Sequence, residues 1–224
     1  MPFVLQKYGL KILNNQIRQN SALTKLLFGV KLNGKFRIHW DFTTLLLKKC
    51  LVEYINKESK VLEIGTGPYA ILSIYLKKKI NCQIDSCDIN KGYMDNALIT
   101  AKENRADISI YRSDLFDNVN GKYDVIFFNS VYIPEEKGIE LGINKLHDYK
   151  TDWCGGNEGI STISNFFAEC GLYLNEGGKV FLGFNPKYCE FDKIKNLSSG
   201  YGLSMFLYYR KRFNPSGVLI LSKK

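Results

Sequence analysis

The sequence predicts an α/β fold in which a seven-stranded, mostly parallel and doubly wound sheet ends in an antiparallel hairpin. Two observations lead to this prediction. From Lys60 onward, short apolar runs alternate with segments of helical periodicity, which is the pattern of β-α-β crossovers. Near the end, two strand-like runs are joined through residues 214–217, Asn-Pro-Ser-Gly, which is typical of a turn. A chain of 224 residues that is 45% hydrophobic can bury the core that such a fold needs.

The first 57 residues are predicted to form a helical, basic extension that precedes a main domain over residues 58–224. Apolar residues between positions 4 and 17 recur at near-helical spacing and predict an amphipathic helix. A looser stretch with two glycines follows. Asp41 is then the candidate N-cap of a second helix, because a Thr pair and an apolar face come directly after it.

Each later element is indicated by its own residue pattern. Strands are predicted where short apolar runs stand between turn residues, and helices where apolar residues recur every three or four positions. The predicted strands cover residues 61–64, 82–87, 108–111, 125–128, 179–184, 203–209 and 218–221, and the predicted helices cover residues 69–78, 92–104 and 159–173. Parallel strands joined by helices leave their carboxyl ends at one edge of the sheet, where ligands bind in folds of this class.

Charge is distributed unevenly along the chain. Residues 1–60 hold eleven Lys/Arg against three Asp/Glu, a net of +8, and residues 191–224 hold seven against one, a net of +6. The middle, residues 61–190, holds thirteen against eighteen, a net of −5. Basic ends favour contact with a polyanion such as RNA, and a solvated lysine-rich surface is the alternative interpretation.

The sequence lacks the features of a membrane protein, a disulfide-bonded protein and a metal-binding protein. No apolar run is long enough to span a membrane, so we expect no membrane partner. The six cysteines form no C-x-x-C pair and no metal-ligand spacing with His39 or His147, so we expect reduced thiols, a cytoplasmic protein and no metal. His39 and its neighbour Trp40 either shape a substrate entrance or pack against the core. His147 is not expected to be catalytic.

A glycine loop follows the first predicted strand of the sheet. The run Glu-Ile-Gly-Thr-Gly places Gly65 and Gly67 where a tight turn can bring a ligand close to the backbone. Glu63 would repel a pyrophosphate but suits a cationic amino group, which counts against an NAD-dependent oxidoreductase. Asp88 ends the next strand, where an acid can hold ribose hydroxyls, and Asp114 follows the third strand, where it can accept from an adenine amine.

This series, an E-x-G-x-G loop and two strand-end acids, resembles the class I S-adenosylmethionine-dependent methyltransferases, which have a Rossmann-like fold. The resemblance implies S-adenosyl-L-methionine as the cofactor. It implies that the glycine loop holds the methionine part, that Asp88 holds the ribose and that the segment after the third strand holds the adenine. The cofactor-binding residues that it implies are Glu63, Gly65, Thr66, Gly67, Asp88, Ile89, Asp114, Leu115, Phe116 and Asn129.

The segment after the fourth strand, Asn-Ser-Val-Tyr-Ile-Pro, resembles the N-P-P-Y motif of amino-group methyltransferases. Oxygens of an Asn side chain and of the following backbone can bind N–H hydrogens and orient a nitrogen lone pair, and an aromatic ring can stack on a planar substrate. The resemblance therefore implies Asn129 and Tyr132 as catalytic residues. Ser130 and Val131 replace both prolines, which leaves a non-catalytic RNA-binding or scaffold protein on the same fold as an alternative.

Residues 152–160, Asp-Trp-Cys-Gly-Gly-Asn-Glu-Gly-Ile, resemble the W-x-G-G-x-x-G segment of the release-factor glutamine methyltransferases, the HemK/PrmC group. The resemblance covers about residues 60–184 and implies N-methylation of a glutamine amide in a protein of the translation machinery. Pro68 and Tyr69 depart from the group's G-T-G-S-G loop, and this loop also resembles ribosomal RNA adenine-N6 methyltransferases. An RNA base is therefore the alternative acceptor, which the basic ends would help to bind.

Overall fold

The computed structural model describes residues 17–210 and 214–224. Within them the α-helices are α2 (Ser21–Phe28), α3 (Phe42–Tyr54), α4 (Ile71–Ile80), α5 (Lys91–Glu103), α6 (Glu135–Glu140), α7 (Ser161–Cys170) and α8 (Phe191–Gly200). Short 3-10 helices are η2 (Ile143–Lys145), η3 (Lys150–Asp152) and η4 (Gly171–Tyr173). The strands are β1 (Lys60–Ile64), β2 (Gln83–Asp88), β3 (Ser109–Arg112), β4 (Tyr123–Asn129), β5 (Leu174–Phe184), β6 (Leu203–Arg210) and β7 (Gly217–Lys223). The helix predicted over positions 4–17 lies outside the described residues, apart from Ile17.

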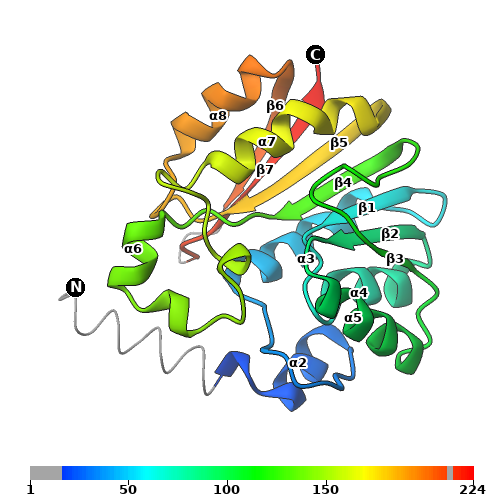
Figure 1. The fold of residues 1–224 in the computed structure, drawn as a ribbon. Coiled ribbons are helices and arrows are strands. Elements are labelled where there is room, and N and C mark those ends of the chain that lie inside the picture. Colours follow the sequence, from blue (N-terminus) through cyan, green and yellow to red (C-terminus); the bar gives the residue numbers. More distant parts are fainter. Residues whose placement is uncertain (1–16, 211–213) are drawn as a thin grey trace.

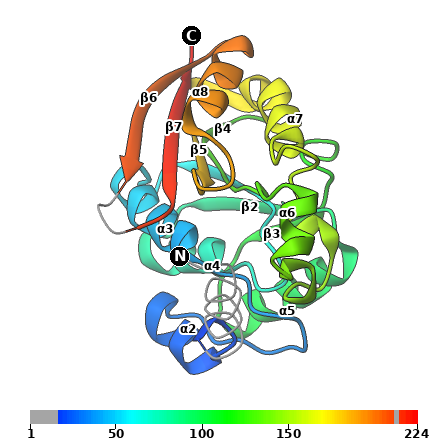
Figure 2. The same ribbon diagram turned by 90° about the vertical axis from the view of Figure 1, so that its left-hand side faces the viewer.

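One seven-stranded sheet organises the molecule, with the strand order β3-β2-β1-β4-β5-β7-β6. Strands β1 to β5 pair in parallel, and β7 pairs antiparallel with both β5 and β6. Figure 2 shows β6 as the outermost strand beside β7. The predicted doubly wound parallel sheet with a terminal antiparallel hairpin is therefore confirmed.

Helices cover both faces of the sheet because its central strands are apolar on both sides. In β4, Val125 and Phe127 belong to the hydrophobic cluster that α3, α4 and α5 complete, whereas Ile126 and Phe128 belong to the cluster on the α7 and α8 face. The two helical layers stand on opposite sides of the sheet in Figure 1. The carboxyl ends of β1, β2 and β4 consequently meet at one edge, between these layers.

The helix predicted at Asp41 is confirmed and has a complete N-terminal cap. The Asp41 carboxylate accepts from the Thr44 backbone N–H at 2.8 Å, and the Thr44 hydroxyl oxygen accepts from the Asp41 N–H at 3.0 Å. Such a reciprocal box satisfies backbone donors that a helix start leaves unpaired. This cap matters for the site because both residues continue into its hydrogen-bond network.

Helices α2, α6 and α8 were not predicted from the sequence. For α2 the signals are present, since the Asn20 side chain accepts from the Leu23 N–H and Gly29 ends the helix at a φ of 66°. In α8 only Ile194 and Ser198 are buried, so its apolar stripe is too narrow to stand out. Helix α6 spans only six residues, fewer than a periodic pattern needs.

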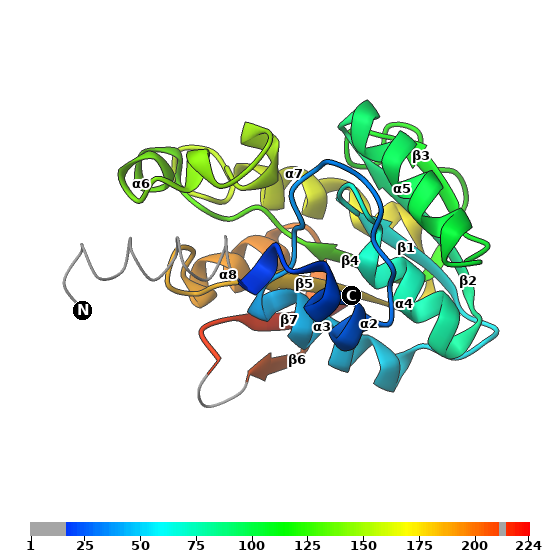
Figure 3. The same cartoon turned by 90° about the horizontal axis from the view of Figure 1, so that it is seen from below.

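The segment before β1 packs against the main sheet. Phe28, Val30, Ile38 and Trp40 belong to the same hydrophobic cluster as the inner residues of α3 and α4. Figure 3 shows α2 beside α3 and α4. The division of the chain at residue 57 stays a prediction. Across the described residues, none of the helices combines the length and apolar character needed to cross a membrane.

Candidate functional site

The glycine loop after β1 needs residues without a side chain. Gly65 and Gly67 have φ values of 69° and 68°, in the left-handed region that favours glycine. A Cβ on Gly65 would lie 2.9 Å from the Phe128 ring, whereas a Cβ on Gly67 would meet nothing within 4 Å. The backbone is therefore packed at Gly65 and open to a ligand at Gly67.

Glu63 is buried beneath this loop with a carboxylate that is already bonded on one side. Its Oε2 accepts from the Thr66 hydroxyl at 2.6 Å and from the Ser73 hydroxyl. Burial raises the pKa of Glu63 from 4.5 to about 7, against the opposing effect of those hydrogen bonds. A cation placed beside Glu63 would favour the ionised form, so the site is suited to a positively charged group.

Asp88, at the end of β2, holds the loops around it in place. Its Oδ2 accepts from the Gly67 N–H at 3.0 Å, and its Oδ1 accepts from the backbone and side chain of Asn90 at 3.0 and 3.2 Å. Burial raises its pKa. Two carboxylate oxygens offer about four acceptor positions, so room remains for a ligand hydroxyl.

A cavity of about 380 Å³, here called the strand-end cavity, lies at these strand ends. It is lined by residues from the ends of β1, β2 and β4 and from the segment after β3. The residues expected to bind cofactor that line it are Glu63, Gly65, Thr66, Gly67, Asp88, Ile89, Asp114, Leu115 and Asn129. Its volume is in the range of small-molecule sites, roughly 300–1,000 Å³.

Phe116 is the exception among the expected residues. Its side chain is fully buried in the core on the α7 face, where its ring stacks on Tyr173 with the centroids 4.8 Å apart. The backbone turns sharply just before it, since Leu115 has a φ of 42°. This turn directs Leu115 to the cavity and Phe116 to the core, so Phe116, unlike the other expected residues, does not line the cavity.

Asn129, the last residue of β4, is oriented by the cap of α3. Its Nδ2 donates to Thr44 Oγ1 at 3.1 Å. The Thr44 hydroxyl donates to Asp41 Oδ1 at 3.0 Å, so its lone pairs are left to accept from the Asn129 amide. The Asn129 Oδ1 is buried and has no hydrogen-bond partner among the described residues. The side chain of this cavity-lining residue therefore keeps one acceptor that no described residue uses.

Ser130 explains how the loop after β4 is held without the prolines of the N-P-P-Y motif. Its backbone N–H and its hydroxyl both donate to the Gly183 carbonyl of β5, at 3.1 and 2.8 Å. A proline has no N–H and could not form the first bond. Hydrogen bonds to β5 therefore fix the loop at this position.

The glycine-rich segment at residues 152–160 packs directly on the same loop. A Cβ on Gly155 would lie 2.8 Å from the Val131 carbonyl oxygen, and one on Gly159 would lie 2.4 Å from that of Tyr132. The Gly155 N–H donates to the Ile133 carbonyl at 3.0 Å. Close approach of two backbones is thus the physical reason for glycine in this segment.

A second cavity of about 300 Å³, here called the loop cavity, lies beyond Asn129. Trp40, Tyr132, Trp153 and Tyr188 give it aromatic walls. The buried Tyr132 hydroxyl donates to Asp41 Oδ2 at 3.2 Å. Its pKa is raised well above 10 by burial and by the Asp41 charge, so it remains a neutral donor.

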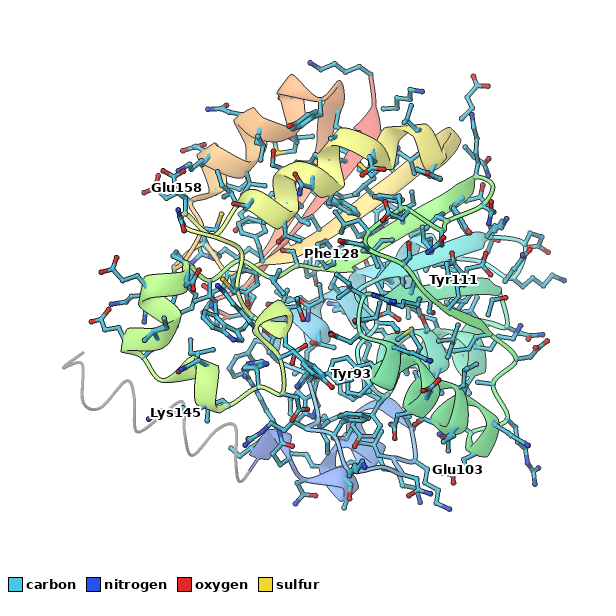
Figure 4. All side chains as sticks on the ribbon, in the orientation of Figure 1. Tyr93, Glu103, Tyr111, Phe128, Lys145 and Glu158 are labelled. Atoms are coloured by element: carbon cyan, nitrogen blue, oxygen red, sulfur yellow. The ribbon has the colours of Figure 1, made fainter. Side chains whose placement is uncertain are left out.

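The two cavities share part of their lining, namely His39, Asn129, Val131 and Asp152. Sequence reasoning left the roles of His39 and Trp40 open, and both line the loop cavity. It missed Thr44 and Asp152, whose side chains orient other site residues. Tyr93, labelled in Figure 4, donates to Asp152 Oδ2 at 2.7 Å and was also missed. For Asp152, the sequence did offer one indication, because this residue is the first of the glycine-rich segment 152–160.

Comparison with known proteins relates this chain to methyltransferases. Residues 31–135 match the family model described as the methyltransferase small domain. The chain is 40% identical over 139 residues to a Methanocaldococcus jannaschii protein whose name assigns it protein N5-glutamine methyltransferase activity, covering 61% of this chain and 66% of that protein. It is 29% identical over 163 residues to the release factor glutamine methyltransferase of Streptococcus pneumoniae, covering 71% and 58%.

Solved structures show the same fold. A methyltransferase from Pyrococcus furiosus superposes with a TM-score of 0.67 at 22% sequence identity, covering 93% of this chain and 97% of that one. The resemblance drawn from the sequence motifs and the Rossmann-like fold are thereby confirmed. The chain spans about three fifths to two thirds of the length of the two curated relatives.

Proposed function

We propose that this chain, a member of the class I methyltransferases, transfers a methyl group from S-adenosyl-L-methionine to a planar nitrogen. We propose further that the acceptor is a glutamine side-chain amide of a protein of the translation machinery. The names of the relatives support this acceptor, since they refer to glutamine N5 and to release factors.

The strand-end cavity fits the proposed cofactor. The buried Glu63 carboxylate suits the cationic amino group of the methionine part, and Asp88 has about one acceptor position left for a ribose hydroxyl. Gly67 leaves its backbone bare towards the cavity, and Asp114 and Leu115 line its far side, where the adenine would lie. The cofactor would supply an electrophilic methyl group on a sulfonium.

The unpartnered Asn129 Oδ1 is the observation that carries the proposed reaction. Asn129 lines both cavities, and in the proposed complex a group entering from the loop cavity would donate an N–H to this oxygen. An amide nitrogen held this way would present its lone pair to the methyl group that the cofactor supplies, and the nitrogen would release one proton to solvent water. Positioning of this kind is what a weakly nucleophilic amide needs. The Tyr132 ring in the loop cavity is proposed to stack on the planar amide.

The basic ends support a proposed contact with RNA near the substrate. Part of this charge, at residues 1–16 and 211–213, lies outside the described residues. The six cysteines are free thiols in the structure, which supports a reducing compartment such as the cytoplasm.

The proposal is tested by radiolabelled methyl transfer into a ribosome-rich lysate fraction, with separate protease and ribonuclease digestion. Asn129→Ala serves as the matched control, because it should bind cofactor and yet transfer methyl groups about 10²–10³-fold more slowly. Label that protease releases, present only with the natural chain, is the expected result. Label that ribonuclease releases would replace the glutamine acceptor with an RNA base. Absence of label after both the protease and the ribonuclease digestion would contradict the proposed macromolecular acceptor.

A further inference from the structure

Three metal-ligating side chains converge between the two cavities. The ligand atoms of His39, His147 and Asp152 all lie within 4.8 Å of one another. His39 Nε2 is 3.9 Å from Asp152 Oδ2, and the two imidazole rings have centroids 5.0 Å apart. His39 comes from the segment before α3, and the other two come from the loop around η3. Their distance in the sequence explains why residue spacing indicates no metal.

The two imidazoles offer lone pairs that nothing in the described part of the chain uses. His39 Nε2 and His147 Nδ1 are buried and have no hydrogen-bond partner there. Burying a nitrogen that has no bonding partner costs free energy of folding. A bound ion or molecule that bonds to the nitrogen would remove this cost. A neutral imidazole binds a metal ion through such a nitrogen.

Two hydrogen bonds hold the Asp152 carboxylate in its orientation. Its Oδ2 accepts from the Tyr93 hydroxyl at 2.7 Å and from the Tyr149 N–H at 2.9 Å. Such surrounding bonds orient ligands in metal sites. Two cations, Arg37 and Arg18, add to the effect of burial in lowering the pKa of His39, and Arg37 is paired with Asp148 at 3.8 Å.

We propose that His39, His147 and Asp152 bind one divalent transition-metal ion of the zinc type. Two neutral imidazoles and a carboxylate are a donor set that suits such an ion. Metal–ligand bonds of about 2.0–2.2 Å require the three side chains to approach one another, and the ion would join the segment before α3 to the loop around η3. Three protein ligands leave a coordination position for water or for an oxygen of a bound molecule.

The experiment uses the full chain after chelation and dialysis, titrated with Co²⁺ as the probe and followed by visible absorption. Zn²⁺ is then added to displace Co²⁺, and thermal unfolding is measured with and without Zn²⁺. The ligand variants are His147→Ala and Asp152→Asn. Asp152→Asn keeps an oxygen that can accept from Tyr93 and Tyr149, so its fold is expected to persist. Cys154→Ser is the matched control. The Cys154 thiol lines the same cavity as His39 and Asp152 and could bind a metal ion, but it is not one of the three proposed ligands.

One Co²⁺ per chain is expected to bind, with affinity lowered more than about tenfold in both ligand variants and unchanged in Cys154→Ser. Zn²⁺ should raise the unfolding temperature of the natural chain and not that of Asp152→Asn. Circular dichroism checks that each variant is folded, and His147→Gln replaces His147→Ala if the latter is not. Absence of saturable binding, or equal binding by Asp152→Asn, would overturn the proposal. Loss of binding in Cys154→Ser alone would move the ion to that thiol.

Discussion

The strand-end cavity and the loop cavity meet at Asn129, but they are built in different ways. The strand-end cavity takes its acidic groups from the ends of β1 and β2 and from the segment after β3, and more distant residues such as His39 and Asp152 complete its lining. The Asp88 carboxylate in this cavity already accepts hydrogen bonds from Gly67 and Asn90, which also belong to the lining. The loop cavity is formed by segments far apart in the chain. Buried polar atoms of His39, Asn129 and His147 line it and have no hydrogen-bond partner within residues 17–210 and 214–224, and His39 and Asn129 line the strand-end cavity as well.

This difference indicates how the two halves of the site work. Local hydrogen bonds preorganise the strand-end cavity for one ligand, so its recognition depends on short motifs. The loop cavity keeps acceptors available for groups that arrive with another molecule, and its specificity depends on how distant segments meet. Substitutions at Asn129 and in the strand-end cavity should therefore separate methyl transfer from cofactor binding.

Asn129→Ala should show the largest effect and separate the two cavities most clearly. Methyl transfer is expected to fall by about 10²–10³-fold, the scale of losing one preorganised group that acts in the transition state. Cofactor affinity should stay unchanged, since the Glu63 and Asp88 contacts remain. Single-turnover transfer and titration calorimetry measure the two quantities. Full activity in this variant would remove Asn129 from the reaction.

Asp88→Ala should have the opposite pattern. Loss of this acceptor is expected to weaken cofactor binding by about 1–3 kcal/mol. Transfer at saturating cofactor should be largely retained, because the loop cavity is untouched. Calorimetry at several cofactor concentrations checks the affinity, and an unchanged value would withdraw the assignment of Asp88 to the ribose.

Glu63 should make cofactor binding depend on pH. With a folded-state pKa of about 7, cofactor affinity is expected to rise as pH increases through 7, because the ionised carboxylate attracts the amino group. Stability should change in the opposite direction. A pKa raised above the usual 4.5 contributes stability that is complete below about pH 4.5 and is lost as pH rises through 7.

Glu63→Gln is the matched variant for this dependence. It should bind cofactor weakly at every pH and should lose the contribution of Glu63 to the change in stability between pH 4.5 and 7. Calorimetry and denaturant unfolding at a series of pH values test both. Identical pH profiles in the two chains would show that Glu63 is not the titrating group.

Ser130→Ala should have the smallest effect. Removing the hydroxyl that donates to Gly183 is expected to lower the free energy of unfolding by about 0.5–1.5 kcal/mol. The backbone bond to Gly183 remains, so methyl transfer should change little. Denaturant unfolding measures the loss. A large fall in transfer would show that the serine hydroxyl has a role in the site beyond holding the loop.

Much of the strand-end cavity was predictable because its residues are tied to local structure. Glu63, Gly65 and Gly67 stand at the end of a strand, and positive φ at the two glycines limits what can replace them. Phe116 shows the limit of such reasoning. It follows Asp114 and Leu115 in the motif, but the turn at Leu115 points its ring into the core, and no local pattern indicates that turn.

The sequence by itself determined the seven strands, helices α3, α4, α5 and α7, the glycine loop, the strand-end acids and the family resemblance, because each depends on short-range periodicity or spacing. Only the tertiary structure decided how Thr44 orients Asn129, how Ser130 takes the place of a proline, and that His39 meets His147 and Asp152. These contacts join segments far apart in the chain. Their formation depends on how helices and loops pack over the sheet, which residue spacing does not encode.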